Sequence, residues 1–217
     1  MNGALPVFDL ALSRAERSDG RREPSFLVFS DGSRHPFPCA DWCGQAIPGD
    51  ETLTDRCAGP TLDVGCGPGR LVSAVMRKGV PVLGIDISSE SLRQTRQRGG
   101  AAIERDVFAR LPGEHRWHTI LLADGNVGIG GDPVGLLRRC GELAAPTGEV
   151  LVEVTGPSTP SRAGAARMET ARLRSPWFPW AQVSIVDIEM VAAAAGLRVV
   201  AAWSSHRRWF AALARQG

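Results

Sequence analysis

Short apolar runs alternate with longer amphipathic segments over the middle of the chain. Runs at 60–64, 81–87, 101–104, 118–123 and 149–154 predict strands. The segments at 71–78, 89–97 and 133–143 predict helices, the second capped by Ser88 or Ser89 and the third with Pro133 in its first turn. Strands that alternate with helices favour a parallel sheet with right-handed crossovers.

The two ends of the chain show other patterns. Residues 185–195 predict a helix that stops at Gly196, and 197–203 and 209–213 predict a closing antiparallel pair of strands. Residues 1–50 are rich in turn signals, with one short strand at 26–29 and a hairpin turn at Asp31-Gly32. A short helix at 51–57 leads into the first strand of the sheet. We therefore expect one domain over 1–217, with an N-terminal elaboration over 1–50 and an α/β core over 51–217.

A glycine-rich turn follows the first strand of the predicted sheet. Gly65, Gly67 and Gly69 stand at alternate positions between this strand and the helix at 71–78. Glycines are needed where a turn adopts dihedrals that a Cβ would forbid, or where a ligand lies against the backbone. The free N–H groups at the start of the helix would then face that ligand.

An acid at the end of the second strand supports a nucleoside site. Asp86 lies 21 residues after Gly65, close to the spacing of a ribose-binding carboxylate in a βαβ unit. A dinucleotide fold requires Gly-x-Gly-x-x-Gly, but Arg70 occupies the position of its third glycine. We therefore expect a nucleoside cofactor other than NAD.

The run from Asp63 to Gly69 closely resembles motif I of the class I S-adenosylmethionine-dependent methyltransferases. The resemblance covers about residues 53–213, and its other motifs gain weight through their order and spacing. It implies a Rossmann-like α/β fold: a seven-stranded, mostly parallel sheet with helices on both faces and an antiparallel C-terminal strand. It also implies that S-adenosylmethionine binds outside the carboxyl ends of the strands.

The resemblance assigns roles in cofactor binding to particular residues. The glycine loop would cradle the amino-acid part of the cofactor, Asp63 would orient the loop or the cofactor's amino group, and Asp86 would accept hydrogen bonds from the ribose hydroxyls. Ile87, Asp106 and Val107 would contact the adenine. The full cofactor-binding set is Asp63, Gly65, Cys66, Gly67, Gly69, Asp86, Ile87, Asp106, Val107 and Ala123.

Less regular segments are the candidates for substrate recognition. The loop from Ala123 passes beside the cofactor's methionine end in this family; here it lacks the Asn/Asp-Pro-Pro-aromatic tetrad of many base and amide N-methyltransferases. An insert after strand five, at about 155–183, commonly forms a lid. The predicted substrate residues are Asn126, Trp177, Trp180 and Arg174, and the predicted catalytic residues are Asp124 and His206, the latter by its pKa near neutrality.

Composition limits the alternatives. The net charge of +2 argues against dedicated nucleic-acid binding, and no apolar run approaches the ~20 residues of a membrane span. The N-terminal residues lack the pattern of a signal peptide. Five cysteines without a Cys-x-x-Cys pair fit reduced thiols in a cytoplasm better than a disulfide framework or a metal site, so we expect no metal.

The sequence therefore predicts a cytoplasmic enzyme that transfers a methyl group from S-adenosylmethionine to a small molecule, anionic or aromatic, through an O or N nucleophile. Two alternatives remain open. The arginine-rich insert could hold RNA or protein as a macromolecular substrate, or the chain could bind the cofactor without catalysis. The sequence does not determine the acceptor or the oligomeric state.

Overall fold

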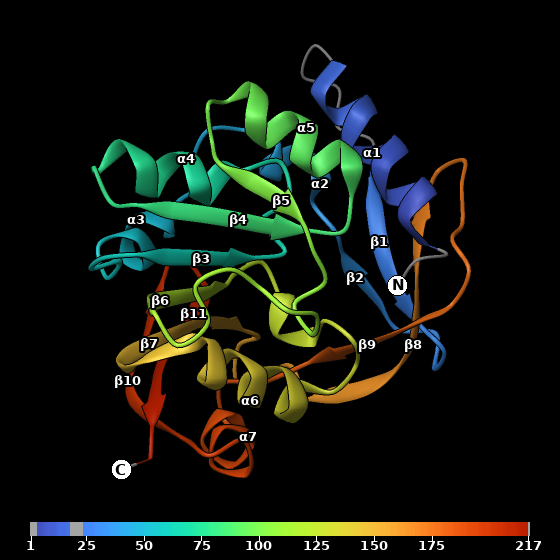
Figure 1. Ribbon diagram of the computed structural model, residues 1–217. Coiled ribbons are helices and arrows are strands. Elements are labelled where there is room, and N and C mark those ends of the chain that lie inside the picture. The colour runs from blue at the N-terminus through green and yellow to red at the C-terminus, as the bar shows by residue number, and fades with distance from the viewer. Residues whose placement is uncertain (1–3, 18–23, 217) are drawn as a thin grey trace.

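The computed structural model describes residues 4–17 and 24–216, which fold around two β-sheets (Figure 1). The larger sheet has seven strands in the order β10-β11-β7-β6-β3-β4-β5. These strands are β3 (Thr61–Val64), β4 (Val82–Asp86), β5 (Ala102–Glu104), β6 (Trp117–Leu122), β7 (Ala144–Val154), β10 (Leu197–Ser205) and β11 (Arg208–Arg215). The predicted fold class is confirmed: β3 to β7 pair in parallel, and β11 runs antiparallel to both of its neighbours.

Helices cover both faces of this sheet. On one face lie α6 (Pro133–Leu143) and α7 (Ile188–Ala194), which pack against Ile120 and Leu122 of β6. On the other face lie α3 (Asp50–Thr54), α4 (Arg70–Arg77) and α5 (Ser89–Gln97); α3 and α4 pack against Leu121. Three consecutive apolar residues in β6 are therefore all fully buried, as expected for a strand with both faces covered.

Local signals set the ends of the helices as predicted. The Ser88 side chain accepts a hydrogen bond from the Ser91 N–H at 3.0 Å and caps α5. Pro133 occupies the first turn of α6, where its missing N–H costs nothing, and the Asp132 side chain caps that helix. These caps fix where each crossover returns to the sheet.

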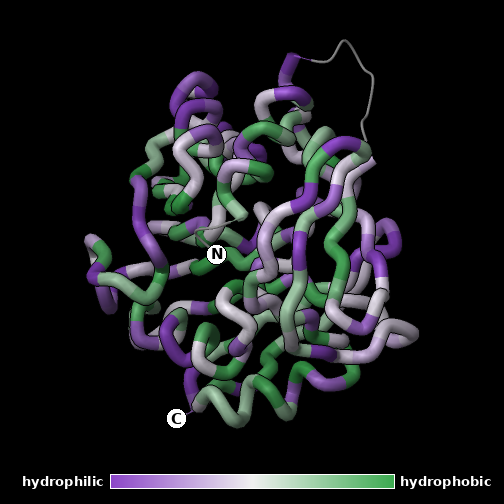
Figure 2. Tube along the Cα trace, turned by 90° about the vertical axis from the view of Figure 1, so that its right-hand side faces the viewer, coloured by the Kyte–Doolittle hydropathy of each residue, from purple (hydrophilic) through white to green (hydrophobic). Residues whose placement is uncertain are grey.

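The smaller sheet has four antiparallel strands in the order β2-β1-β8-β9. Strands β1 (Ser25–Phe29) and β2 (Arg34–Pro36) form the predicted hairpin, while β8 (Arg162–Thr170) and β9 (Phe178–Gln182) come from the insert after β7. The two parts join through β1 and β8, with Phe26 opposite Glu169. The insert is thus a pair of strands that forms one sheet with the N-terminal hairpin. This smaller sheet faces the viewer in Figure 2.

The N-terminal region is more ordered than its turn-rich sequence suggested. It contains α1 (Leu5–Arg17) and the short α2 (Cys39–Trp42), which pack together around Leu12, Cys39, Trp42 and Met168. Leu5, Phe8 and Leu12 follow helical spacing, a signal for α1 that was not used to predict a helix there. In the described residues, no helix has the length and apolar character to cross a membrane.

Candidate active site

The main pocket lies at the carboxyl ends of β3, β4, β5 and β6, between the larger sheet and the smaller sheet. We divide its lining in two. The polar half consists of lining residues from the loops after these four strands, from Asp63 to Asn126. The apolar half consists of Ala4, Leu5, Phe8, Leu27, Phe37, Trp42, Met168, Phe178 and Trp180, from α1, α2 and the smaller sheet.

The three glycines of the loop after β3 have different reasons to be glycine. All have positive φ, from 53° to 83°. A Cβ on Gly65 would lie 2.7 Å from the Asn126 amide nitrogen, and one on Gly69 would lie 2.6 Å from the Thr95 hydroxyl oxygen. A Cβ on Gly67 would meet no atom of the described residues within 4 Å. Two glycines therefore allow close packing, and the third keeps backbone open to the pocket.

Asp86 holds the glycine loop in place from the end of β4. Its carboxylate accepts hydrogen bonds from the N–H groups of Gly67 at 2.9 Å and Ser88 at 2.8 Å. Burial raises the pKa of Asp86 to about 6, although these backbone hydrogen bonds oppose the rise. Each oxygen keeps lone-pair capacity for a ligand, because a carboxylate accepts about four hydrogen bonds.

Asp63 brings a carboxylate with an unused oxygen to the same loop. The residue is 2% exposed, and its Oδ2 has no hydrogen-bond partner in the part of the chain that the structure describes. Burial raises the pKa of Asp63 to about 7, and the negative charge of Asp124 adds to the rise. An unpaired carboxylate in a pocket wall favours a ligand with N–H donors, above all a positively charged one.

The loop after β5 closes the far side of the polar half. Asp106, Val107 and Ile87 all line the pocket. The Asp106 Oδ1 accepts a hydrogen bond from the Phe108 N–H at 2.9 Å, which fixes the turn and leaves Oδ2 for a ligand. Val107 and Ile87 present apolar surface beside it, a combination suited to a flat heteroaromatic ring with a polar edge.

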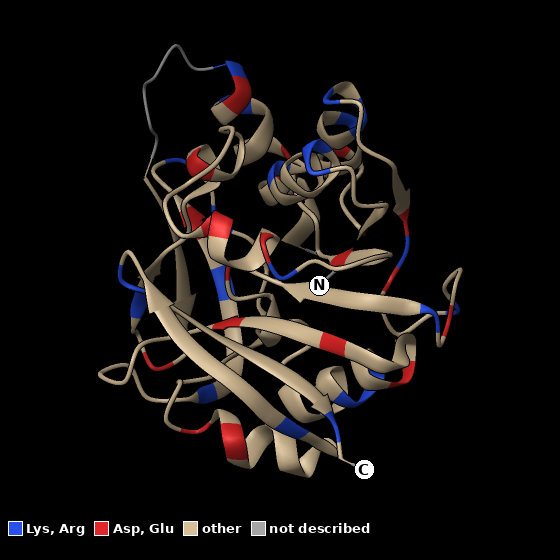
Figure 3. Ribbon diagram, turned by 90° about the vertical axis from the view of Figure 1, so that its left-hand side faces the viewer, with Lys and Arg blue, Asp and Glu red and all other residues tan. Residues whose placement is uncertain are grey.

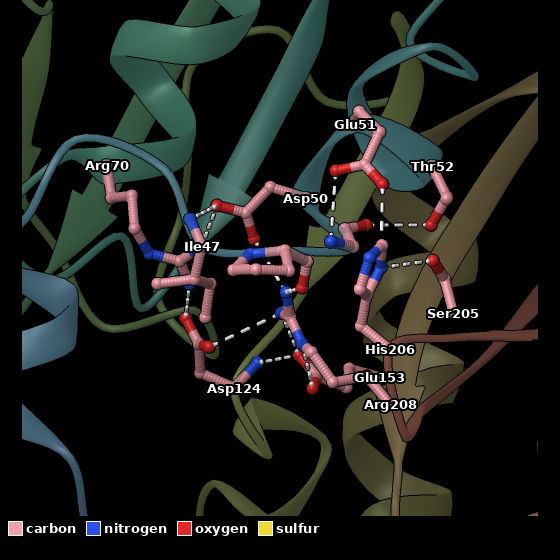
Figure 4. Close-up of polar contacts among 12 residues, drawn as sticks. Ile47, Asp50, Glu51, Thr52, Arg70, Asp124, Glu153, Ser205, His206 and Arg208 are labelled. Carbon is pink, nitrogen blue, oxygen red and sulfur yellow. Dashed lines mark hydrogen bonds and ion pairs between the residues drawn. The ribbon is translucent and has the colours of Figure 1, made fainter.

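A buried network of charges supports the pocket from behind (Figure 4). The Arg70 guanidinium pairs with both Asp50 and Asp124. Arg208 from β11 pairs with Asp50 at 2.8 Å and with Glu153 at 2.8 Å, and lies 3.6 Å from Asp124. The network therefore connects α3, α4, β7, β11 and the loop after β6. Arg70, noted in the sequence only as a missing glycine, is its centre.

This network gives a structural role to Asp124, which was predicted as a catalytic residue. Asp124 lines the pocket, but its two oxygens face the guanidinium groups of Arg70 and Arg208. Its N–H donates to Glu153 at 2.7 Å, and its φ of 55° holds the loop in a left-handed turn. Paired in this way, the carboxylate positions the loop after β6, while burial raises its pKa to about 6.

Asn126 also acts on the loop rather than facing the pocket freely. It lines the pocket as predicted, but its amide nitrogen donates to the carbonyl oxygens of Val64 at 2.9 Å and Gly65 at 2.8 Å. It thereby ties the loop after β6 to the glycine loop. Ala123 and Cys66 contribute small side chains to the same wall.

Three of the predicted catalytic and substrate residues lie outside the pocket lining. His206 is exposed in the β10–β11 turn, where its Nδ1 lies 2.9 Å from the Ser205 hydroxyl and 3.9 Å from the Glu51 carboxylate. Trp177 is 47% exposed beneath the Arg167 guanidinium, and Arg174 pairs with Glu169 at 3.4 Å. The structure thus offers no pocket role to these three, whereas Trp180 lines the pocket and is 7% exposed.

Most residues of the apolar half were not predicted from the sequence as site residues. Helix α1 is held over the pocket by a hydrogen bond from the Ser88 hydroxyl to Asp9 at 2.5 Å and by an ion pair between Glu16 and Arg93. Phe8, Phe37, Trp42 and Met168 were not candidates, because contacts between distant segments, including those of α1 and the pairing of β1 with β8, bring them to the pocket.

Part of the chain matches a known protein family. Residues 61–148 match the methyltransferase domain family. A S-adenosylmethionine-dependent methyltransferase from Bacteroides fragilis, solved with S-adenosyl-L-homocysteine, has a TM-score of 0.81 and 20% identity, over 100% of this chain and 98% of that chain. No curated protein matches the chain in sequence.

Two further structures share the fold at lower similarity. The 1,6-didemethyltoxoflavin-N1-methyltransferase of Burkholderia thailandensis has a TM-score of 0.55 and 19% identity, over 76% of this chain and 74% of that chain. The sugar N-methyltransferase KedS8 of a Streptoalloteichus species has a TM-score of 0.58 and 15% identity, over 77% of this chain and 85% of that chain. The resemblance to class I methyltransferases is confirmed.

Proposed function

Because residues 61–148 belong to the methyltransferase domain family, we propose that this enzyme transfers a methyl group from S-adenosylmethionine to a small-molecule acceptor with an apolar or aromatic body. The observation that carries the proposal is the pocket itself. A loop with an open glycine and an unpaired carboxylate lies opposite a wall of aromatic and aliphatic side chains.

The residues of the polar half fit S-adenosylmethionine. The open backbone at Gly67 leaves room for the amino-acid part, and the unpaired Oδ2 of Asp63 suits its ammonium group. Asp86 and Asp106 each retain acceptor capacity, for the ribose hydroxyls and the adenine amino group respectively. When bound, the cofactor supplies an electrophilic methyl group on a sulfonium.

This chain's own contribution is to bind, align and exclude water. The glycine loop is fixed on three sides, by Asp86, by Asn126, and by the Thr95 hydroxyl, which donates to the Gly67 carbonyl at 2.8 Å. A loop held so firmly presents the cofactor in one orientation, which is the main requirement of an in-line displacement. The apolar half then packs an acceptor against the reacting centre and excludes water.

The side chains of the apolar half favour an apolar or aromatic acceptor over an anionic one. Among the described residues, its wall contains no arginine. Three arginines of the insert are instead paired outside it: Arg162 with Asp31 at 3.0 Å, and Arg167 and Arg174 with Glu169. On the face drawn in Figure 3, basic and acidic residues are interspersed. These pairings also weaken the case for an RNA substrate, which would need unpaired cations along an extended surface.

Titration calorimetry with S-adenosylmethionine, S-adenosylhomocysteine and NAD tests the cofactor. We expect binding of the first two in roughly the micromolar range and none of NAD. Release of S-adenosylhomocysteine across a panel of aromatic amines, phenols and sugars tests turnover. Binding of NAD alone would refute the proposal; tight cofactor binding with no turnover on small molecules, RNA or protein would favour a non-catalytic module.

Two glycine variants make the test specific to the pocket. Gly67 and Gly79 both have positive φ, 53° and 75°, and open space where a Cβ would lie, but only Gly67 lines the pocket. Alanine at either position should cost about 1 kcal/mol of stability. Gly67→Ala should in addition weaken cofactor binding at least about tenfold, whereas Gly79→Ala should leave it unchanged. Equal affinities would place the cofactor elsewhere.

A further inference from the structure

A second, smaller cavity adjoins the main pocket. It measures about 70 Å³, against about 230 Å³ for the main pocket. The two share Leu27, Phe37, Asp124 and Trp180 in their linings. A space of this size holds a few water molecules or one small functional group, and not a second ring system. The smaller cavity therefore lies against some of the same side chains as the main pocket.

The smaller cavity is lined by two residues with unpaired polar atoms. His35, in the outer strand β2, and Gln182, in the outer strand β9, both line it. The His35 Nε2 and the Gln182 Oε1 are buried and have no hydrogen-bond partner within residues 4–17 and 24–216. Buried polar groups in folded proteins are nearly always paired, so two unpaired atoms beside one cavity indicate a polar ligand group.

Charge around the cavity favours a hydrogen-bond donor. Asp124 and Glu153 line it, and with Asp50 they set three carboxylates against the two guanidinium groups of Arg70 and Arg208. Burial and the nearby Arg162 lower the pKa of His35, so its imidazole is neutral and keeps one lone pair. The lining of the cavity includes acceptor oxygens of Asp124, Glu153 and Gln182 and, among the described residues, no lysine or arginine.

We propose that the smaller cavity is the subsite for a hydrogen-bond-donating group of the acceptor, an amine or a hydroxyl, and that His35 and Gln182 determine specificity for it. This inference rests on the proposed function, because it treats the main pocket as the site of the cofactor and the acceptor's body. It adds to that function the polar group that the acceptor must carry and the two residues that recognise it.

Three matched probes test the subsite on the full chain loaded with S-adenosylhomocysteine. 1-Naphthylmethylamine, 1-naphthalenemethanol and 1-methylnaphthalene share one aromatic body and differ in the group they offer. We expect the amine or the alcohol to bind at least about tenfold more tightly than the methyl compound, by calorimetry or saturation-transfer NMR. Comparing the affinity of the amine with that of the alcohol shows which of the two donor groups the subsite prefers.

Variants then assign the preference to the two residues. His35→Phe keeps a ring against Phe29, whose centroid lies 5.7 Å away, and Gln182→Met keeps the side-chain length. In the double variant the preference should fall below about threefold, with cofactor affinity unchanged. Its melting temperature should not fall, because each change removes an unpaired polar atom. His118→Phe, at the opposite, amino end of β6, is the matched control and should keep the preference.

The outcomes separate this inference from the proposed function. Failure of S-adenosylhomocysteine to bind would refute the proposed function before any probe is added. If it binds and the donor-bearing probes gain nothing in the wild-type chain, the subsite is refuted while the proposed function stands. A preference that persists in the double variant would equally refute the roles of His35 and Gln182.

Discussion

In the polar half of the pocket, backbone N–H groups and carboxylates come from loops that follow neighbouring parallel strands. In the apolar half, side chains come from residues 4–42 and 168–180, which the packing of α1 and the pairing of β1 with β8 bring together. The polar half is thus built by local turns, each with its own sequence signal. The apolar half is built by a contact between distant segments. The proposed function therefore assigns cofactor binding and acceptor selection to separate parts of the chain.

The largest expected effect tests whether the apolar half is structural as well as functional. Trp180 is 7% exposed, packs edge-on against Phe178 with centroids 6.1 Å apart, and belongs to the core of the smaller sheet. Trp180→Ala should therefore cost ~3–5 kcal/mol of unfolding free energy, a fall in melting temperature of about 10 °C. Thermal melting measures it.

Trp177→Ala is the matched control, since Trp177 is 47% exposed and outside the pocket lining. Its melting temperature should change little. If Trp180→Ala melts like the wild type and only the acceptor's KM rises, then Trp180 acts as a lid rather than as core. Equal, large losses for both variants would contradict the exposure of Trp177.

An intermediate effect is expected at Asp86, in the polar half. Asp86→Ala removes the acceptor of the Gly67 and Ser88 N–H groups together with the ribose hydrogen bonds that the proposed function assigns to this carboxylate. At ~1.5–3 kcal/mol for hydrogen bonds to a charged group, cofactor affinity should fall more than about tenfold, measured by calorimetry. Some stability should also be lost, because the glycine loop loses its anchor.

Asp86→Asn separates the two roles. The amide oxygen still accepts from one loop N–H, so the melting temperature should stay closer to the wild type, while the loss of charge still weakens cofactor binding. Unchanged affinity in both variants would show that the carboxylate supports the loop and does not contact the cofactor.

The smallest effect concerns the pH dependence that Asp63 contributes. Burial raises its pKa from 3.8 to about 7, so between these values the folded chain holds a proton that the unfolded chain has lost. The contribution of Asp63 to stability is therefore greatest below pH 3.8 and is lost as the pH rises through about 7. Cofactor affinity should change in the opposite direction, because the ammonium group requires the ionised carboxylate.

Calorimetry from about pH 8 to about pH 6.5 should show wild-type affinity falling about threefold relative to Asp63→Asn, which cannot titrate. The variant corrects for protonation of the cofactor itself and for Asp86, whose pKa of about 6 lies lower. Parallel pH profiles for the two proteins would exclude Asp63 as the partner of the ammonium group.

The polar half could be predicted from the sequence because each of its elements is determined by residues that lie close together in the chain. The alternate glycines reflect positive φ, Ser88 caps the helix it precedes, and Asp86 ends a strand whose length the apolar run sets. All ten predicted cofactor residues except Gly69 line the pocket, and Gly69 begins α4 directly behind it. Their contact with the cofactor itself stays a prediction.

The predictions of substrate and catalytic residues rested on residue type alone. His206 was predicted because histidine titrates near neutral pH, and Arg174 and Trp177 because arginine and tryptophan can contact substrates. Whether such side chains can reach a substrate depends on their exposure and ion pairing. His35 was overlooked for the converse reason. Nothing around it in the sequence marks it, and its importance arises only from the cavity that β2 and β9 enclose with the loop after β6.

The sequence alone determined the strand and helix order of the core, the glycine loop and the acids that follow β3, β4 and β5, since turn geometry, capping and hydrophobic periodicity act over a few residues. Tertiary structure decided which side chains line the apolar half of the pocket, how Asp124 is paired, and where unpaired polar atoms remain. These depend on packing between segments as far apart as β1 and β8, and on burial, which sets the energetic cost of each polar atom and has no local signature in a chain.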